Sequence, residues 1–263
     1  MRSYLAILKI RMKMLFQYRA AAFAGICTQV FWGIIQVMIF QAFYSGVSGR
    51  EPMSLTQTIT FIWLGQALLQ LLPWSIDKEV GEQIRNGHVA YELIRPIHLY
   101  RLWYVRSFAM SFVPTVLRCA PIFILGGLFL GLAAPASWLG GFFFFLSVIF
   151  SFFLSAAIKA LVISSLFWTI SGEGILRLLP HITVLLSGMV IPLPLFPNWL
   201  QPFLSVQPFR GIIDIPSRLY TGIIPSSEAI YYLGFQLGWT ILLIALGQFL
   251  LKKALRQFVV QGG

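Results

Sequence analysis

Residues 1–44, MRSYLAILKIRMKMLFQYRAAAFAGICTQVFWGIIQVMIFQAFY, decide the fold, because a band of cations is followed directly by an uncharged apolar stretch. The cations are Arg2, Lys9, Arg11, Lys13 and Arg19. A helix needs about 20 apolar residues to cross the hydrocarbon core of a bilayer, and the stretch after Arg19 is long enough. The same alternation recurs along the chain, which indicates a membrane protein.

The composition supports this interpretation. Apolar residues make up 58% of the 263-residue chain and charged residues only 10%, whereas a soluble domain carries about 25% charged residues. The net charge of +11 is therefore a membrane-topology signal, and a nucleic-acid partner is not expected. Backbone groups in a bilayer must be satisfied within each segment, so the spans are helices. We predict an all-α polytopic membrane protein with one domain, residues 1–263.

The length allows about six crossings, and the apolar stretches predict where they lie. The predicted spans are residues 20–44, 57–75, 107–133, 139–169, 175–191 and 229–251. The fifth is short for a full crossing. Residues 192–228 contain seven prolines among apolar and aromatic residues, which excludes one long helix. We expect short re-entrant or extracellular helices there.

The N-terminal residues 1–19 predict an amphipathic helix. Tyr4, Leu8, Met12 and Leu15 recur at spacings of three and four, with cations gathered to one side. Such a helix would lie in the membrane interface with its cations near anionic headgroups. The alternative is that these residues are only the charged flank of the first span.

Lysine and arginine also predict the orientation. With both termini inside, cytoplasmic segments hold fourteen Lys and Arg residues, and the other side holds only Arg50, Arg210 and Arg218. This asymmetry favours an even number of spans with cytoplasmic N- and C-termini. Residues 45–56 would then be external.

Residues 76–106 form the longest polar stretch. Asp77 and Glu79 precede Arg85 and the helix-ending pair Asn86-Gly87, as in a helix whose ends match its dipole. A second helix would begin at Val89 and end before Pro96. This pattern predicts two short cytoplasmic helices that project as a knob where a partner could dock. The alternative is a solvated connector.

Two cations lie inside apolar stretches, Arg118 and Lys159, and a charge within a membrane is costly enough to suggest a function. Arg118 could line a water-filled path or an interface with a partner subunit, or it could be a tolerated snorkelling side chain. Lys159 could snorkel toward the cytoplasmic interface.

Motifs for chemistry are missing from the sequence. It has no phosphate-binding loop, no His-Glu-x-x-His pair and no nucleophile elbow. Three histidines and two cysteines lack metal-ligand spacing. We therefore expect no catalytic site, no metal and no cofactor bound by this chain.

Several short motifs together carry a family resemblance over essentially the whole chain. They are Leu72-Pro73-Trp74, Ile84-Arg85-Asn86-Gly87, Glu92-Leu93-Ile94-Arg95-Pro96, Ser187-Gly188, Ile191-Pro192, Phe196-Pro197-Asn198-Trp199-Leu200 and Gln207-Pro208-Phe209-Arg210. With the cationic amphipathic start, they resemble an ABC-2-type transporter permease. The chain looks most similar to the prokaryotic subgroup in which two permeases work with one separate ATPase.

The resemblance implies a six-helix permease half in the prokaryotic plasma (inner) membrane. It would pair with a second permease, the same or a related chain, and with two copies of an ABC ATPase that bind ATP and Mg. A coupling helix would lie between Asp77 and Arg95, with ATPase-coupling residues Asp77, Glu79, Glu82, Arg85, Glu92 and Arg95. The segment after the fifth span would form an extracellular gate.

The resemblance implies export, and a lipid, an amphipathic drug or a peptide would all suit the apolar spans. The nearest alternative is a secondary transporter of a small amphipathic solute. It would more often show intramembrane acids and an internal repeat, and the sequence shows neither. A membrane enzyme would need clustered acids or histidines, and a scaffold without transport activity is the remaining alternative.

Overall fold

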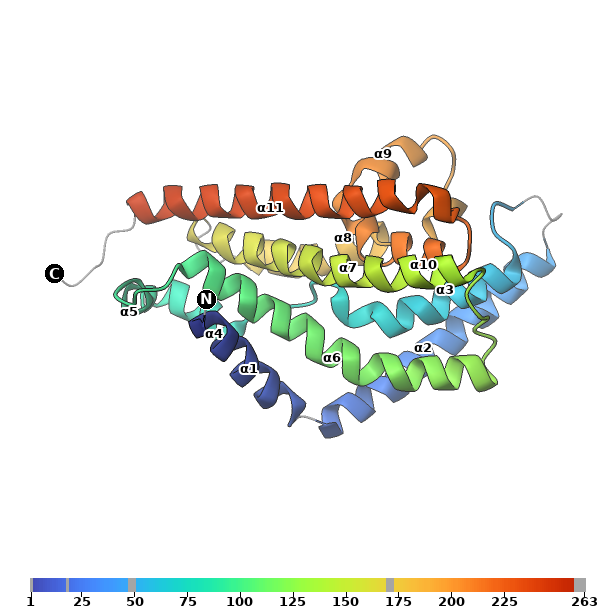
Figure 1. The fold of residues 1–263 in the computed structure, drawn as a ribbon, viewed down its shortest axis with the longest axis horizontal. Helices are drawn as coiled ribbons and strands as arrows, with labels where there is room; N and C mark the ends of the chain where they lie inside the picture. Colours follow the sequence, from blue (N-terminus) through green and yellow to red (C-terminus); the bar gives the residue numbers. More distant parts are fainter. Residues whose placement is uncertain (1, 18, 47–50, 169–172, 258–263) are drawn as a thin grey trace.

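The computed structural model describes residues 2–17, 19–46, 51–168 and 173–257, and within these ranges it is helical with no strand. Figure 1 shows long helices lying roughly side by side along one axis of the molecule. The prediction of an all-helical membrane protein is confirmed at this level.

Four helices of the described chain are long and apolar enough to cross a membrane. They are α2 (Arg19–Ser45), α6 (Leu99–Phe129), α7 (Trp138–Ser165, continued by a 3-10 turn at Leu166–Trp168) and α11 (Ala229–Gln257). At about 1.5 Å per residue each can extend through the roughly 30 Å hydrocarbon core. α6 includes residues 99–106, which the sequence alone places in the polar segment.

Two further apolar helices are shorter. α3 (Leu55–Leu68) begins at a capping box formed by Ser54 and Gln57 and ends in a 3-10 turn, Leu69–Leu71. α8 (Glu173–Leu186) has 14 residues and contains Pro180. Neither reaches the usual length of a span, so the count of six crossings stays a prediction.

α7 occupies the centre of the bundle and packs against α6, α10 and α11, while α2 packs against α3 and α6. Ala156, Ala157 and Ala160 of α7 are fully buried, and such small residues allow helices to approach closely. Trp63 of α3 is also buried, and its indole N–H donates to the Leu130 carbonyl at 2.7 Å. The core is thus aliphatic and aromatic, with small residues at the central helix.

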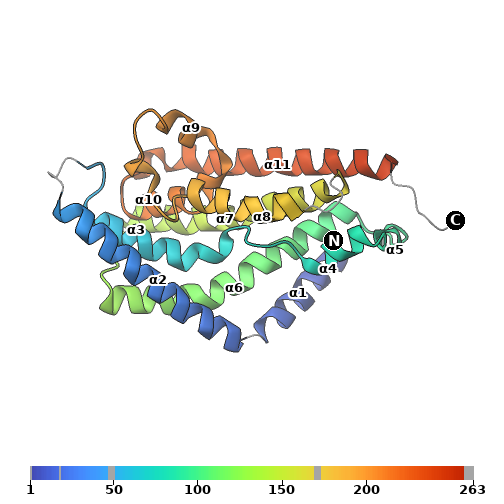
Figure 2. The ribbon, with the colours of Figure 1, turned by 180° about the vertical axis from the view of Figure 1, so that it is seen from behind.

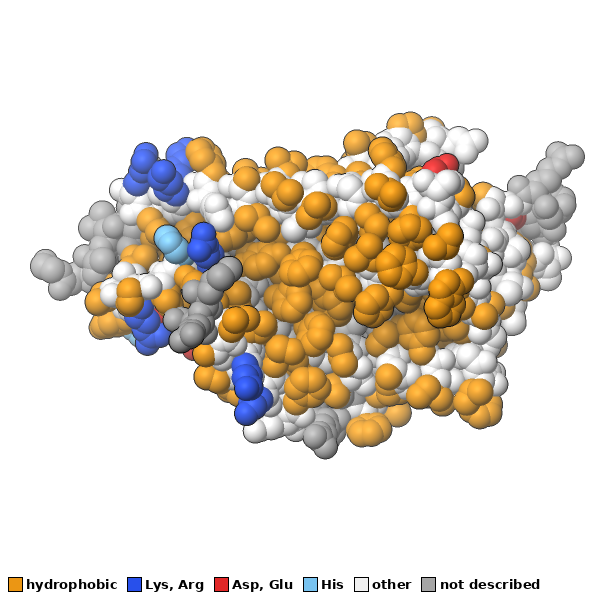
Figure 3. Space-filling view, viewed as in Figure 1, with side chains coloured by type: hydrophobic (Ala, Val, Ile, Leu, Met, Phe, Trp, Pro, Cys, Tyr) orange, Lys and Arg blue, Asp and Glu red, His pale blue; other side chains and the backbone are white. Residues whose placement is uncertain are grey.

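One end of the molecule carries α1 (Arg2–Phe16), α4 (Lys78–Arg85), α5 (Val89–Leu93), the first turns of α6 and the last turns of α11. We call it the cationic end. On the face seen in Figure 3, the Lys and Arg side chains gather toward this end, and apolar side chains cover the middle of the molecule. An apolar belt of this kind is typical of a surface that faces lipid.

The opposite end carries α9 (Gln201–Val206), α10 (Asp214–Tyr220) and 3-10 turns at Leu193–Leu195, Pro208–Gly211 and Ser226–Glu228. We call it the α9–α10 end. Prolines at the starts of several of these pieces keep them short. Polar side chains from the long helices satisfy the broken backbone: Ser151 and Gln236 both donate to the Gly211 carbonyl, at 2.8 and 2.7 Å.

Candidate functional site

The candidate site is the pair of short helices α4 and α5 at the cationic end. Asp77 caps α4, because its side chain accepts from the Glu79 amide at 3.1 Å. Arg85 lies in the last turn and complements the helix dipole. Gly87, with φ of +71°, makes the reversal into α5, a conformation that favours glycine. The local sequence therefore builds a tight helical hairpin.

The apolar side of this hairpin is anchored on the bundle. Val80 and Val89 are fully buried in a cluster with Trp103 of α6 and Ile163 of α7. The hairpin is therefore packed directly against two long helices.

An ion-pair network joins three helices at this place. Arg106 of α6 donates to Asp77 at 2.7 Å and to Glu79 at 2.6 Å, and Arg11 of α1 donates to the same Glu79 oxygen at 2.5 Å. The hydrogen bond from Arg11 is the main cause that lowers the pKa of Glu79, and Arg106 adds to it. Helices α1, α4 and α6 are thereby linked by charge as well as by packing.

The six predicted coupling residues fall into two groups. Asp77, Glu79, Glu92 and Arg95 are held by partners within the chain, and Glu92 accepts from Arg95 at 3.3 Å. Glu82 and Arg85 are exposed and make no ion pair with another described residue. Together with Lys78, which is also exposed and has no ion pair among the described residues, they are the charges of α4 that remain available to a partner.

Helix α1 is fixed beside α6 by a second contact. The Tyr4 hydroxyl accepts from the His98 amide at 2.7 Å, just before α6 begins. The sequence predicted α1 as an amphipathic helix but gave no signal that Arg11 would reach Glu79, because the two residues are 68 positions apart.

Arg118 lies on α6 where it meets α2. Its guanidinium lies against Gly25, since a Cβ atom placed there would come within 2.3 Å of the Arg118 Cζ. The Arg118 Nε is buried and has no hydrogen-bond partner in the described chain. The other predicted intramembrane cation, Lys159, is buried and donates to Ser111 Oγ at 2.8 Å, so it does not snorkel to a surface.

A second charged cluster lies at the α9–α10 end, and the sequence analysis did not predict it. Asp214 is fully buried between Arg210 and Arg218, at 3.5 and 3.4 Å. Arg210 also lies over the rings of Tyr232 and Phe235. The i, i+4 spacing on either side of Asp214 was the available signal.

In the part of the chain that the structure describes, no three His, Cys, Asp or Glu residues gather as metal ligands. The site is a charged surface on the α4–α5 hairpin, and the hairpin is packed against long apolar helices.

The comparisons with known proteins agree with this architecture. The sequence model of a family described as ABC-2 family transporter protein matches residues 30–262. Neither curated proteins nor solved structures gave a significant match. The match covers most of the chain, including the α4–α5 hairpin, the second part of α2 and all of α6, α7 and α11. The chain therefore belongs to the ABC-2 family of transporter proteins, and it is a multi-pass membrane permease of an ABC transporter.

Proposed function

We propose that the chain is the permease half of an ATP-driven exporter and that a separate ABC ATPase docks on the α4–α5 hairpin. The observation that carries this proposal is the network of Arg106, Asp77, Glu79 and Arg11, because it ties the exposed knob to a long membrane helix. A push on α4 would be transmitted to α6 and α1 together.

The proposal gives each part of the cationic end a role. Glu82 and Arg85 are exposed and free to contact the ATPase, while the buried apolar side of α4 transmits the force into the bundle. ATP and Mg would bind to the ATPase, and this chain would supply no catalytic group. Both termini would face the cytoplasm, in the prokaryotic inner membrane, because most of the cations lie on that side.

The remaining parts of the proposal follow the family. Six membrane segments would arise if α3 and α8 complete their crossings with the residues beside them. Two permease chains, identical or related, would assemble with two ATPase copies, and the α9–α10 end would form the outer gate. The cargo would be a lipid, an amphipathic drug or a peptide.

The docking proposal is tested by reversing two of the free charges of α4, Glu82→Lys with Arg85→Glu. We expect the ATPase to be lost from the purified permease, while the permease still inserts and remains monodisperse, because neither residue has a partner within the described chain. The matched control is Glu228→Lys, an exposed reversal at the α9–α10 end, which should leave copurification unchanged.

Retained copurification together with full ATP-dependent transport in the double variant would exclude α4 as the docking site. Transport that continues after ATP depletion would instead favour the secondary transporter.

A further inference from the structure

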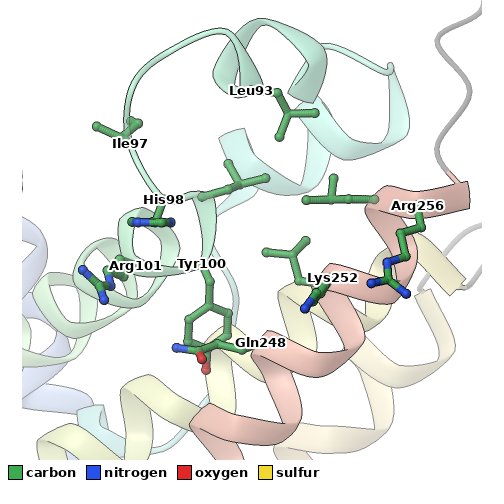
Figure 4. A pocket seen from close by; sticks show the side chains of 11 residues that line it. Leu93, Ile97, His98, Tyr100, Arg101, Gln248, Lys252 and Arg256 are labelled. Atoms are coloured by element: carbon green, nitrogen blue, oxygen red, sulfur yellow. The ribbon is translucent and has the colours of Figure 1, made fainter.

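A groove at the cationic end lies between the first turns of α6 and the last turns of α11, and Figure 4 shows its outer part. It consists of two adjoining cavities of about 630 and 510 Å³, which share Tyr100, Arg101 and Gln248 in their walls. Each cavity has the size of an ordinary small-molecule site. We call these two adjoining cavities together the α6–α11 groove.

The mouth of the groove is cationic. Arg101 lies on the α6 side, and Lys252 and Arg256 lie on the α11 side. No aspartate or glutamate lines either cavity among the described residues, and none of these three cations has an ion-pair partner there. The mouth therefore presents uncompensated positive charge to whatever occupies it.

The inner part of the groove is mainly apolar. Leu5 of α1, Val105 of α6 and Ile244 of α11 line it, together with the rings of Tyr4 and Tyr104. The groove thus changes from charged to apolar along its length, and the amphipathic helix α1 forms one wall.

Tyr100 lines both parts and supplies an independent sign of a ligand. Its side chain is only 6% exposed, and its hydroxyl is buried without a hydrogen-bond partner. The ring packs on the α11 backbone at Gly247, where a Cβ atom would come within 2.6 Å of it. An unsatisfied buried hydroxyl is costly, and a polar group in the groove would satisfy it.

We propose that the α6–α11 groove binds an anionic phospholipid from the membrane leaflet beside the cationic end. The phosphate would lie among Arg101, Lys252 and Arg256 and within reach of the Tyr100 hydroxyl, and an acyl chain would lie along Val105 and Ile244. Basic pockets between membrane helices are suited to anionic headgroups. A soluble anion would leave the apolar part unused, and a cationic amphiphile would be repelled at the mouth.

This inference depends on the membrane placement of the chain and not on ATPase docking. It is tested with the full-length protein in phosphatidylcholine nanodiscs that contain a trace of photoactivatable phosphatidylglycerol. Mass spectrometry would map the crosslinks, which we expect on the first turns of α6 and the last turns of α11. The triple variant R101Q/K252Q/R256Q should reduce this labelling about tenfold or more, because each cation near a headgroup contributes to binding.

The matched control is K9Q/K13Q/R85Q, which removes three exposed cations of the same end outside the groove. Labelling should stay close to the unmodified protein. Val105→Trp would narrow the apolar part of the groove without removing any of its cations, and it should also reduce labelling. It provides a second test if the triple variant is not monodisperse.

Three results would overturn the proposal. Equal loss in the control triple variant would mean general attraction to the surface. Equal labelling by photoactivatable phosphatidylcholine would mean that the mouth does not select charge. Displacement of the lipid by excess glycerol phosphate would identify a site for a soluble anion.

Discussion

The two ends of the molecule both contain an arginine cluster around acidic residues, but the clusters differ in burial. At the α9–α10 end, Asp214 is fully buried between Arg210 and Arg218. At the cationic end, Glu79 receives two arginines while about half of its side chain remains exposed. The first cluster is closed and holds broken backbone in place, whereas the second is open at the surface and can respond to a partner.

Asp214→Asn should have the largest effect, because it leaves the buried guanidinium of Arg210 and the partly buried one of Arg218 without a carboxylate. Removal of one partner from a buried ion pair costs about 3–5 kcal/mol. We expect a markedly lower melting temperature in detergent, with exposed Glu228→Gln as the matched control. An unchanged melting temperature would show that the buried Asp214 cluster does not stabilise the fold.

Arg106→Gln tests the open cluster and should destabilise the protein by about 2 kcal/mol, since Asp77 loses a charged partner while Glu79 keeps water and Arg11. The matched control is Lys9→Gln, which removes an exposed cation of α1 outside the network. We also expect the ATPase to remain bound while ATP hydrolysis no longer drives transport. Normal transport by this variant would show that the ion-pair network is not needed to couple ATP hydrolysis to transport.

Arg118→Leu should change the stability by no more than about 1 kcal/mol, because it removes both a partly buried charge and an unsatisfied Nε. Transport should fall if the charge lines a path or an interface. The double variant with Gly25→Ala should fold better than Gly25→Ala alone, since the guanidinium would no longer collide with the new methyl group. Normal transport by Arg118→Leu would leave this arginine without a function.

The smallest effect is expected from pH. The pKa of Glu79 is lowered in the folded protein, so its contribution is present above the ordinary value of 4.5 and is lost as the pH falls through the lowered pKa. The side chain is half exposed, so the loss should stay below about 1 kcal/mol. Spin labels on α1 and α4 should report a widening distance in acid, and Glu79→Gln should remove that change. A distance that stays constant would show that packing alone holds α1 in place.

The sequence predicted the parts that depend on local patterns. Cation bands and apolar runs indicated the long helices, and the order of acids, Arg85 and Asn86-Gly87 indicated α4. The sequence could not predict which distant residues would meet. Arg11 reaches Glu79, Lys159 reaches Ser111 and Tyr4 reaches His98 only because the helices pack side by side. The α6–α11 groove was missed for the same reason, since Arg101 and Lys252 are 151 positions apart in the sequence.

The Gly211 carbonyl has a consequence for the order of assembly. Its two donors are Ser151 of α7, which precedes Gly211 in the sequence, and Gln236 of α11, which follows it. During synthesis the proline-broken segment therefore enters the membrane region before one of its donors exists. A chain that stops before α11 would leave this segment partly unsatisfied, and membrane quality control should recognise such a chain as incomplete. We therefore expect the hydrogen bonding of this segment to be complete only after α11 has been synthesised.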